Sequence, residues 1–96
     1  MPARDGRRPV SPVVTLYGRA DCHLCDQARE AILRLRDELG ELELREIDID
    51  GDERLLAAYL ERIPVVEVDG EVVSELLLDP HDLRQSLLSS RERADG

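Results

Sequence analysis

The sequence predicts an α/β domain in which one four-stranded mixed sheet carries helices on both of its faces. Three observations support this prediction. Extended apolar stretches alternate with stretches of helical periodicity, a hairpin-turn dipeptide joins the last two extended stretches, and a long helical stretch separates the first two. The order β-α-β-α-β-β-α makes the first three elements a right-handed parallel crossover, while the later hairpin can add only antiparallel strands.

The first expected strand is VVTLY, residues 13–17, a short apolar run rich in β-branched residues. Pro12 and Gly18 bound it on either side. A run of this kind is typical of a central strand whose two faces are both covered. We therefore place it in the middle of the sheet.

A long helix is expected to follow this strand. Asp21 is the expected N-cap, because its short carboxylate can accept hydrogen bonds from the unpaired N–H groups of the first turn. Gly40 lies where a helix would end in a left-handed residue. Between these two positions, one helical face is apolar through Leu24, Ala28, Ala31, Ile32, Leu35 and Leu39.

Residues 41–50, ELELREIDID, alternate apolar and acidic residues as a half-exposed edge strand should. The alternation changes phase at Arg45, so we expect either a bulge or a late strand start. Residues 51–63 return to helical spacing, with Asp52 as the expected cap. The apolar positions of this second helix are Leu55, Leu56, Tyr59 and Leu60.

The last part of the chain predicts a hairpin and a helix. Residues 64–74, PVVEVDGEVVS, contain two strands around Asp69-Gly70, a dipeptide that favours tight hairpin turns. Asp79 is a suitable cap, with Pro80 at the first helical position and an acidic residue in the first turn. The apolar side of this helix consists of Leu83, Leu87 and Leu88.

The chain has 96 residues, which suits one domain; we expect it to span residues 12–89, with flexible tails at 1–11 and 90–96. The net charge of −9 disfavours binding to nucleic acids, because phosphates would be repelled. The N-terminal stretch lacks the apolar run of a secretory signal, and no stretch approaches the ~20 apolar residues of a membrane span. We expect a cytoplasmic protein with no membrane partner.

Cys22 and Cys25 are the two cysteines of the chain, and they lie after the first strand at the start of the first helix. A sulfur at a helix N-terminus faces unpaired N–H groups and the positive end of the helix dipole, which favour the thiolate. Cys22 is nearer the helix end and is the expected nucleophile. Cys25 lies one turn further in and is expected to be more buried.

Other interpretations of the cysteine pair remain open. A loop of three residues constrains the unfolded chain little, and structural disulfides are rare in the cytosol, so a purely structural bond is disfavoured. Structural zinc needs four nitrogen or sulfur ligands. Beyond the cysteines the chain offers only His23, which points elsewhere on the helix, and the distant His81. We therefore expect no metal site. Two small residues that happen to lie three apart is the remaining alternative.

Three stretches, VVTLYGRADCHLC, DIDGD and RIPVVEVDG, together resemble the glutaredoxin-like proteins of the thioredoxin superfamily, over residues 13 to about 88. The resemblance implies a thioredoxin-like fold. It also implies a thiol–disulfide oxidoreductase in which Cys22 attacks a substrate disulfide and Cys25 resolves the mixed disulfide. The rival interpretations are a non-catalytic thioredoxin-fold binding module or redox sensor and, further behind, a carrier of metal or of an Fe–S cluster.

The resemblance also implies a substrate-binding edge. The Ile63–Pro64 bond would be cis, with Pro64 beside Cys22, and the backbone of Ile63 would pair with a bound peptide or glutathione. Arg19 stands where glutaredoxins often carry a lysine that contacts glutathione. The expected partners are a protein disulfide or a small thiol, and the expected state is a monomer.

One stretch departs from the family pattern. Glutaredoxins have a Gly-Gly turn after the fourth strand, followed by an acid at a helix start, and these hold the γ-glutamyl end of glutathione. Here Ser74-Glu75 replaces the glycines, with extra residues before Asp82. Side chains in place of glycine hinder a close backbone approach. We expect no bound cofactor; glutathione is a candidate co-substrate, and this departure counts against its use.

Overall fold

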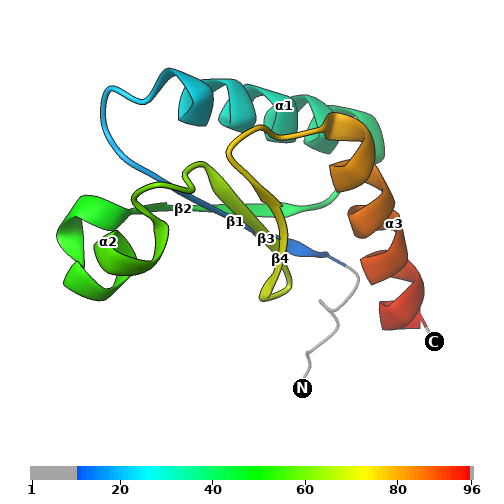
Figure 1. The fold of residues 1–96 in the computed structure, drawn as a ribbon. Coiled ribbons are helices and arrows are strands. Elements are labelled where there is room, and N and C mark those ends of the chain that lie inside the picture. Colours follow the sequence, from blue (N-terminus) through cyan, green and yellow to red (C-terminus); the bar gives the residue numbers. More distant parts are fainter. Residues whose placement is uncertain (1–10, 96) are drawn as a thin grey trace.

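The computed structural model describes residues 11–95, with side-chain surroundings described for residues 11–89. The element order is the one predicted from the sequence, with one short 3₁₀ turn (η2) added before the second helix (Figure 1). The elements are β1 (Val13–Gly18), α1 (His23–Leu39), β2 (Glu43–Asp48), η2 (Ile49–Gly51), α2 (Glu53–Tyr59), β3 (Val65–Val68), β4 (Glu71–Glu75) and α3 (Pro80–Asp95).

The four strands form one mixed sheet in the order β2-β1-β3-β4. β1 pairs with β2 in parallel and with β3 antiparallel, and β3 pairs antiparallel with β4. The expected places of the central strand, of the edge strand and of the hairpin are therefore confirmed. The pairing of β2 is regular from Glu43 to Asp48, so there is no bulge at Arg45. The strand begins at Glu43 and continues through the phase change, which places Leu44 and Ile47 on opposite faces of the sheet.

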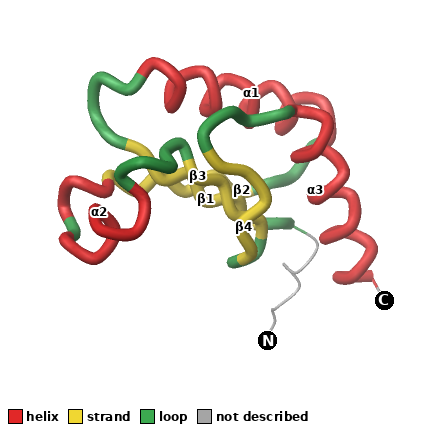
Figure 2. Tube along the Cα trace, in the orientation of Figure 1, coloured by secondary structure: helices red, strands yellow, loops and turns green. Residues whose placement is uncertain are grey.

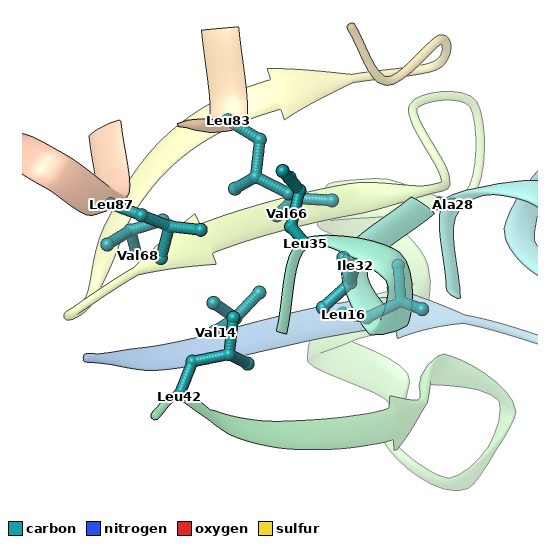
Figure 3. Packing of buried hydrophobic residues seen from close by; sticks show 10 residues of the cluster. All are labelled: Val14, Leu16, Ala28, Ile32, Leu35, Leu42, Val66, Val68, Leu83 and Leu87. Carbon is teal, nitrogen blue, oxygen red and sulfur yellow. The ribbon is translucent and has the colours of Figure 1, made fainter. Parts of the chain in front are cut away.

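Helices α1 and α3 lie over one face of the sheet, and α2 lies on the other side near one end (Figures 1 and 2). Side chains of a strand alternate between the two faces. Leu16 therefore points into the core beneath α1, while Tyr17 points the other way and meets Tyr59 of α2, with ring centroids 5.0 Å apart. Figure 3 shows the main core: Val14, Leu16, Ala28, Ile32, Leu35, Leu42, Val66, Val68, Leu83 and Leu87.

Two of the predicted helix caps are confirmed. The Asp52 carboxylate accepts hydrogen bonds from the N–H groups of Arg54 and Leu55, and the Asp79 carboxylate accepts one from His81 at 2.9 Å. These bonds satisfy donors that the helix itself leaves unpaired. At the other end, α1 stops before Gly40, which has a positive φ of 97°, as predicted. The Gly40 N–H donates to the Arg36 carbonyl.

The predicted N-cap of α1 is wrong by one residue. Cys22 caps the helix, with extended backbone angles (φ −104°, ψ 105°) and a side chain that accepts the N–H of Cys25. Asp21 instead adopts φ 60° and turns the chain just before the cap. Aspartate is one of the few non-glycine residues that visits this left-handed region readily.

Helix α3 runs to Asp95, so the backbone of residues 90–95 continues the helix where the sequence suggested a tail. No proline or glycine interrupts residues 81–95, and once started a helix is extended at little cost. The expected tail at residues 1–10 lies outside the described residues. Among the described helices, none is long and apolar enough to cross a membrane.

Candidate redox site

Cys22 and Cys25 form a disulfide at the N-terminus of α1, with their Cα atoms 5.2 Å apart. Cys22 is partly exposed as the cap residue, whereas only 3% of the surface of Cys25 is exposed. The two sulfurs therefore differ in access. A substrate can approach Cys22 from solvent, while Cys25 is held behind it in the core.

The Cys25 N–H donates a hydrogen bond to Cys22 Sγ at 3.1 Å. The same turn places the Asp26 N–H on the Cys22 carbonyl at 3.1 Å, which fixes Cys22 relative to the helix. After reduction, a negative charge on Cys22 Sγ would face this N–H and the positive end of the helix dipole. Both would favour a thiolate at Cys22 over a thiol; that Cys22 is the nucleophile stays a prediction.

Gly18, the last residue of β1, makes room for the buried sulfur. A Cβ atom at Gly18 would lie 2.9 Å from Cys25 Sγ and 3.1 Å from Cys25 Cβ, closer than real atoms pack. The sequence analysis treated Gly18 only as the boundary of the strand. The signal that could have revealed this role is its position, four residues before Cys22 at the strand–helix junction.

The Ile63–Pro64 peptide bond is cis, as the resemblance implied. Pro64 is fully buried. The pairing of Tyr17 with Val65 places Pro64 opposite Gly18, one position beyond the last antiparallel pair of β1 and β3. Since Gly18 touches Cys25, Pro64 lies at the same end of the sheet as the disulfide; direct contact between Pro64 and the sulfurs stays a prediction.

Ile63 was expected to pair through its backbone with a bound peptide, but its N–H is already used within the domain. Its N–H donates to the carbonyl of Tyr59 at 3.0 Å, closing the end of α2. A bound peptide would therefore pair with the Ile63 carbonyl, or would have to displace this bond. The substrate-binding role itself stays a prediction.

Arg19 lies beside the buried cysteine and forms a 3.1 Å ion pair with Asp50, both side chains being partly exposed. Exposed ion pairs contribute little stability, so Arg19 can exchange Asp50 for another carboxylate at low cost. Arg19 also lines a cleft of about 280 Å³ that reaches the buried sulfur from the β2 side. Its walls include Gly18, Arg19, Cys25, Asp26, Arg29 and Glu46.

Three of the residues that line this cleft, Asp26, Arg29 and Glu46, form a cluster of ion pairs. Arg29 donates to Glu46 at 2.6 Å and to Asp26 at 3.2 Å. The hydrogen bond and charge of Glu46, assisted by Asp26, raise the pKa of Arg29 above its ordinary value. Arg29 thus faces the carboxylate next to Cys25 with a permanent cation, which reduces the repulsion between Asp26 and a thiolate.

The turn after β4 does not begin where the sequence comparison placed it. Ser74 and Glu75 belong to β4 itself, and the first turn residue is Leu76, with φ 67°. The Leu76 N–H donates to the carbonyls of Arg62 at 2.9 Å and Pro64 at 3.0 Å. The backbone position that favours glycine is therefore occupied by a leucine next to the cis-proline.

The part of the chain that the structure describes contains no group of three or more His, Cys, Asp or Glu side chains arranged to hold a metal ion. His23, the histidine nearest the disulfide, is exposed, and its Nε2 lies 3.1 Å from Gln27 Nε2. His81 lies in the first turn of α3, and its N–H is bonded to Asp79.

Comparison with known proteins agrees with this geometry. Residues 13–88 match the family model described as "Glutaredoxin-like domain (DUF836)". An uncharacterised protein of Mycobacterium tuberculosis, Rv0508, is 36% identical over 84 residues, which cover 82% of this chain and 86% of the relative. A protein of Mycobacterium bovis, Mb0520, also uncharacterised, matches to the same extent.

Solved structures share the fold. The X. campestris structural genomics target XcR50 is 38% identical with a TM-score of 0.66, over 79% of this chain and 96% of that one. Protein Ne2328 of Nitrosomonas europaea is 26% identical with a TM-score of 0.70, over 90% and 98%. A mutant thioredoxin of Halobacterium salinarum is 22% identical with a TM-score of 0.62, over 84% and 75%, a likeness of fold alone. With its Cys22–Cys25 pair at the start of α1, this chain belongs to the glutaredoxin-like domain family and has a thioredoxin-like fold.

Proposed function

We propose that this protein is a thiol–disulfide oxidoreductase in which Cys22 is the nucleophile and Cys25 the resolving cysteine. One observation carries the proposal: the disulfide joins a partly exposed sulfur that caps a helix to a buried sulfur one turn inward. A bond of this kind contributes little to stability, because the loop that it closes is very short. Because one sulfur is accessible and the other is buried, the pair suits thiol–disulfide exchange in two steps, in which only Cys22 meets the substrate.

The exchange proceeds in two steps. In the reduced protein, the Cys22 thiolate attacks one sulfur of a substrate disulfide, forms a mixed disulfide and releases the other substrate sulfur as a thiolate. Cys25 then loses its proton and attacks Cys22 Sγ, which releases the second substrate thiolate. The substrate gains two electrons, and the protein returns to the Cys22–Cys25 disulfide until an external dithiol reduces it.

The cleft beside Cys25 supports the second step. Cys25 is almost fully buried, yet its side chain lines a cleft that opens to solvent. Water can therefore take the proton that the Cys25 thiol must lose before it attacks. Arg19 and Arg29, which line the same cleft, favour the negative charge that develops on sulfur.

We propose further that a protein disulfide is the substrate, and that glutathione is a poor co-substrate. Glutaredoxins grip glutathione with backbone N–H groups at a glycine turn, and here the first turn position is Leu76. Its N–H is already bonded to Pro64 and Arg62, and its side chain occupies space that glycine leaves open. Arg19 can still meet a substrate carboxylate, so weak glutathione binding is compatible with the proposal.

The test is turnover of insulin disulfides with dithiothreitol as the reductant, compared among the natural protein and the Cys22→Ser and Cys25→Ser variants. We expect Cys22→Ser to lose all turnover above the uncatalysed rate. Cys25→Ser should instead accumulate a mixed disulfide with the substrate, which mass spectrometry can identify. Limited alkylation of the reduced protein should label Cys22 before Cys25.

Two results would contradict the proposal. A natural protein whose disulfide is reduced and reoxidised but which never turns over insulin would be a redox sensor or a binding module. Labelling of Cys25 before Cys22 would reverse the roles of the two cysteines. The glutathione part is tested separately with a glutathione mixed disulfide, where brisk turnover by the natural protein would refute it.

A further inference from the structure

The cleft between the start of α1 and β2 borders one cysteine of the pair. Cys25 lines this cleft of about 280 Å³, and Cys22, the partly exposed cap of α1, does not. The disulfide therefore has two separate approaches, one to each sulfur. The exchange proposed above brings the substrate to Cys22 and uses the cleft only as a route for a proton. The approach to Cys25 is left for a second reactant.

Gly18 keeps the cleft in contact with the sulfur of Cys25. It lines the cleft, and a Cβ atom at this position would lie 2.9 Å from Cys25 Sγ. The sulfur therefore lies directly beside the place where any other residue would begin its side chain. Because glycine has none, no side chain of residue 18 separates Cys25 Sγ from the cleft, although only 3% of the Cys25 surface is exposed. A molecule inside the cleft is thus brought to this sulfur.

The volume of the cleft limits what can enter. Small-molecule sites usually measure about 300–1,000 Å³, and this cleft lies just below that range. It has room for a thiol compound of a few carbon atoms. A thiol on a folded protein would have to bring part of its backbone in with it, so the second reactant is a small molecule.

The charge of the cleft limits the chemistry of that molecule. Four carboxylates and two guanidinium groups line it: Asp21, Asp26, Glu46, Asp48, Arg19 and Arg29. The lining therefore carries two more negative than positive charges. A ligand that brings a carboxylate of its own is repelled by this surplus, whereas a neutral or cationic ligand is not.

The two sulfurs also differ as leaving groups. Thiolate attack on a disulfide is faster when the sulfur that is expelled is the more stable thiolate. Attack at Cys25 expels Cys22, whose Sγ accepts the Cys25 N–H at 3.1 Å at the positive end of the α1 dipole. Attack at Cys22 would instead expel Cys25 as an anion in a buried position, where charge is poorly solvated. Attack at Cys25 is therefore the favoured route for any thiol that can reach it.

We propose that the cleft admits a small dithiol reductant without anionic groups, which reduces the disulfide by attacking Cys25. The inference rests on the proposed oxidoreductase function and names its reductant. One thiolate of the reductant bonds to Cys25 Sγ, the Cys22–Cys25 bond breaks, and Cys22 leaves as a thiolate. The second thiol of the reductant gives its proton to water and attacks the first reductant sulfur, which closes a cyclic disulfide and releases Cys25 as a thiolate. The protein gains two electrons and the reductant loses two.

The experiment mixes the oxidised protein with three small monothiols of different charge: cysteamine, 2-mercaptoethanol and 3-mercaptopropionate. Acid stops the exchange, and tandem mass spectrometry then shows which cysteine carries the added thiol. Each rate is divided by the rate of the same thiol with hydroxyethyl disulfide, which removes differences in intrinsic reactivity. The test variant is Glu46→Gln. The matched control is Glu43→Gln, because both glutamates lie on β2 and pair with an arginine, but Glu43 does not line the cleft.

We expect the first adduct on Cys25 with each thiol, and a relative rate about threefold lower for 3-mercaptopropionate than for 2-mercaptoethanol. Glu46→Gln should reduce this difference by about twofold, while Glu43→Gln should leave it as it is in the natural protein. A first adduct on Cys22 would overturn the proposal. So would equal relative rates for the three thiols, or a charge preference that the two variants alter equally, because the selectivity would then arise outside the cleft.

Failure of the proposed function can be separated from failure of this inference, because the position of the adduct is measured without any turnover. If the natural protein turns over no insulin but small thiols add first to Cys25, the proposed function is wrong and the cleft remains an entrance for small thiols. If the protein turns over insulin and small thiols add first to Cys22, only the inference about the cleft is wrong.

Discussion

Both ends of the sheet contain residues with positive φ where the chain turns, but the residue types at these positions differ between the two ends. At the hairpin end, the chain reverses at Asp69 and Gly70, with φ of 52° and 88°. Asp69 also exchanges backbone and side-chain hydrogen bonds with Val13 at 2.8 and 2.9 Å. At the redox end, left-handed conformations fall on Asp21 and on Leu76.

This difference distinguishes turn residues that local backbone preference explains from a turn residue, Leu76, that it does not explain. Aspartate and glycine are the residues that local turn energetics prefer, so the hairpin end needs no explanation beyond stability. A leucine in the left-handed region opposes those preferences. Where local preference and structure disagree, a function at that site is the first hypothesis to test.

The largest expected effect tests the close packing at the redox end. Gly18→Ala should lower the free energy of unfolding by about 1–3 kcal/mol, because the new methyl would meet Cys25 Sγ at 2.9 Å. Urea unfolding measures the loss. Gly51→Ala is the matched control, since a Cβ there meets no atom within 4 Å, and it should change stability by less than about 0.5 kcal/mol. Equal effects would show that the contact with Cys25 is relaxed at no cost.

Exchanging glycine for a larger residue at one end and a larger residue for glycine at the other should change the free energy of unfolding in opposite directions. Gly70→Ala should destabilise the protein by about 1 kcal/mol, because φ is 88° and the space around it is open, which leaves backbone strain as the cost. Leu76→Gly should stabilise it by about 0.5 kcal/mol, since relief of strain exceeds the added chain entropy. Denaturant midpoints measure both. A clear loss of stability in Leu76→Gly would mean that the leucine is retained for packing within the domain.

The smallest expected effect lies on the sheet face away from α1. Tyr17 donates a hydrogen bond to Glu67 at 3.2 Å, and partial burial, followed by the Glu67 charge, raises the pKa of Tyr17 above 10. The folded protein then holds this proton more tightly than the unfolded chain. The resulting stability is complete below about pH 10 and declines as the pH rises through the folded-state pKa.

Tyr17→Phe should remove this decline, which urea midpoints between pH 8 and pH 11.5 would measure. Tyr59 packs against Tyr17, but its hydroxyl has no comparable carboxylate partner among the described contacts, so Tyr59→Phe serves as the control. An unchanged alkaline slope in Tyr17→Phe would show that the Glu67 contact does not persist in solution.

Most of the fold could be predicted from the sequence because its signals are local. Caps such as Asp52 and Asp79 act within three residues, and the Asp69-Gly70 turn acts within two. The apolar periodicities identified the core faces of α1 and α3 for the same reason, except that Leu24, the first position of the predicted face of α1, is 40% exposed. The end of α3 was misjudged because polar composition resembles a tail, whereas a helix continues until a residue stops it.

The site was predicted in part, and the rest depends on contacts across the sheet. The cysteine pair was predicted from its position at a helix start, and the cis Ile63–Pro64 bond from the resemblance to glutaredoxin-like proteins. The role of Gly18 follows only once β1 and α1 are packed, since the atom it accommodates is seven residues away. The turn at Leu76 was misplaced because leucine rarely adopts a positive φ, so the sequence contains no local signal for a turn there.

Cys22 Sγ, the atom proposed to attack the substrate, also caps the N-terminus of α1. Cys22 Sγ accepts the Cys25 N–H, so a partner that engages this sulfur competes with the amide that holds the first turn together. The proposed redox chemistry would thereby be coupled to fraying of the first turn of α1 through one hydrogen-bond acceptor. The Cys25 amide is therefore a built-in reporter: its proton chemical shift and its exchange rate with deuterium follow the bonding state of Cys22 without any added label.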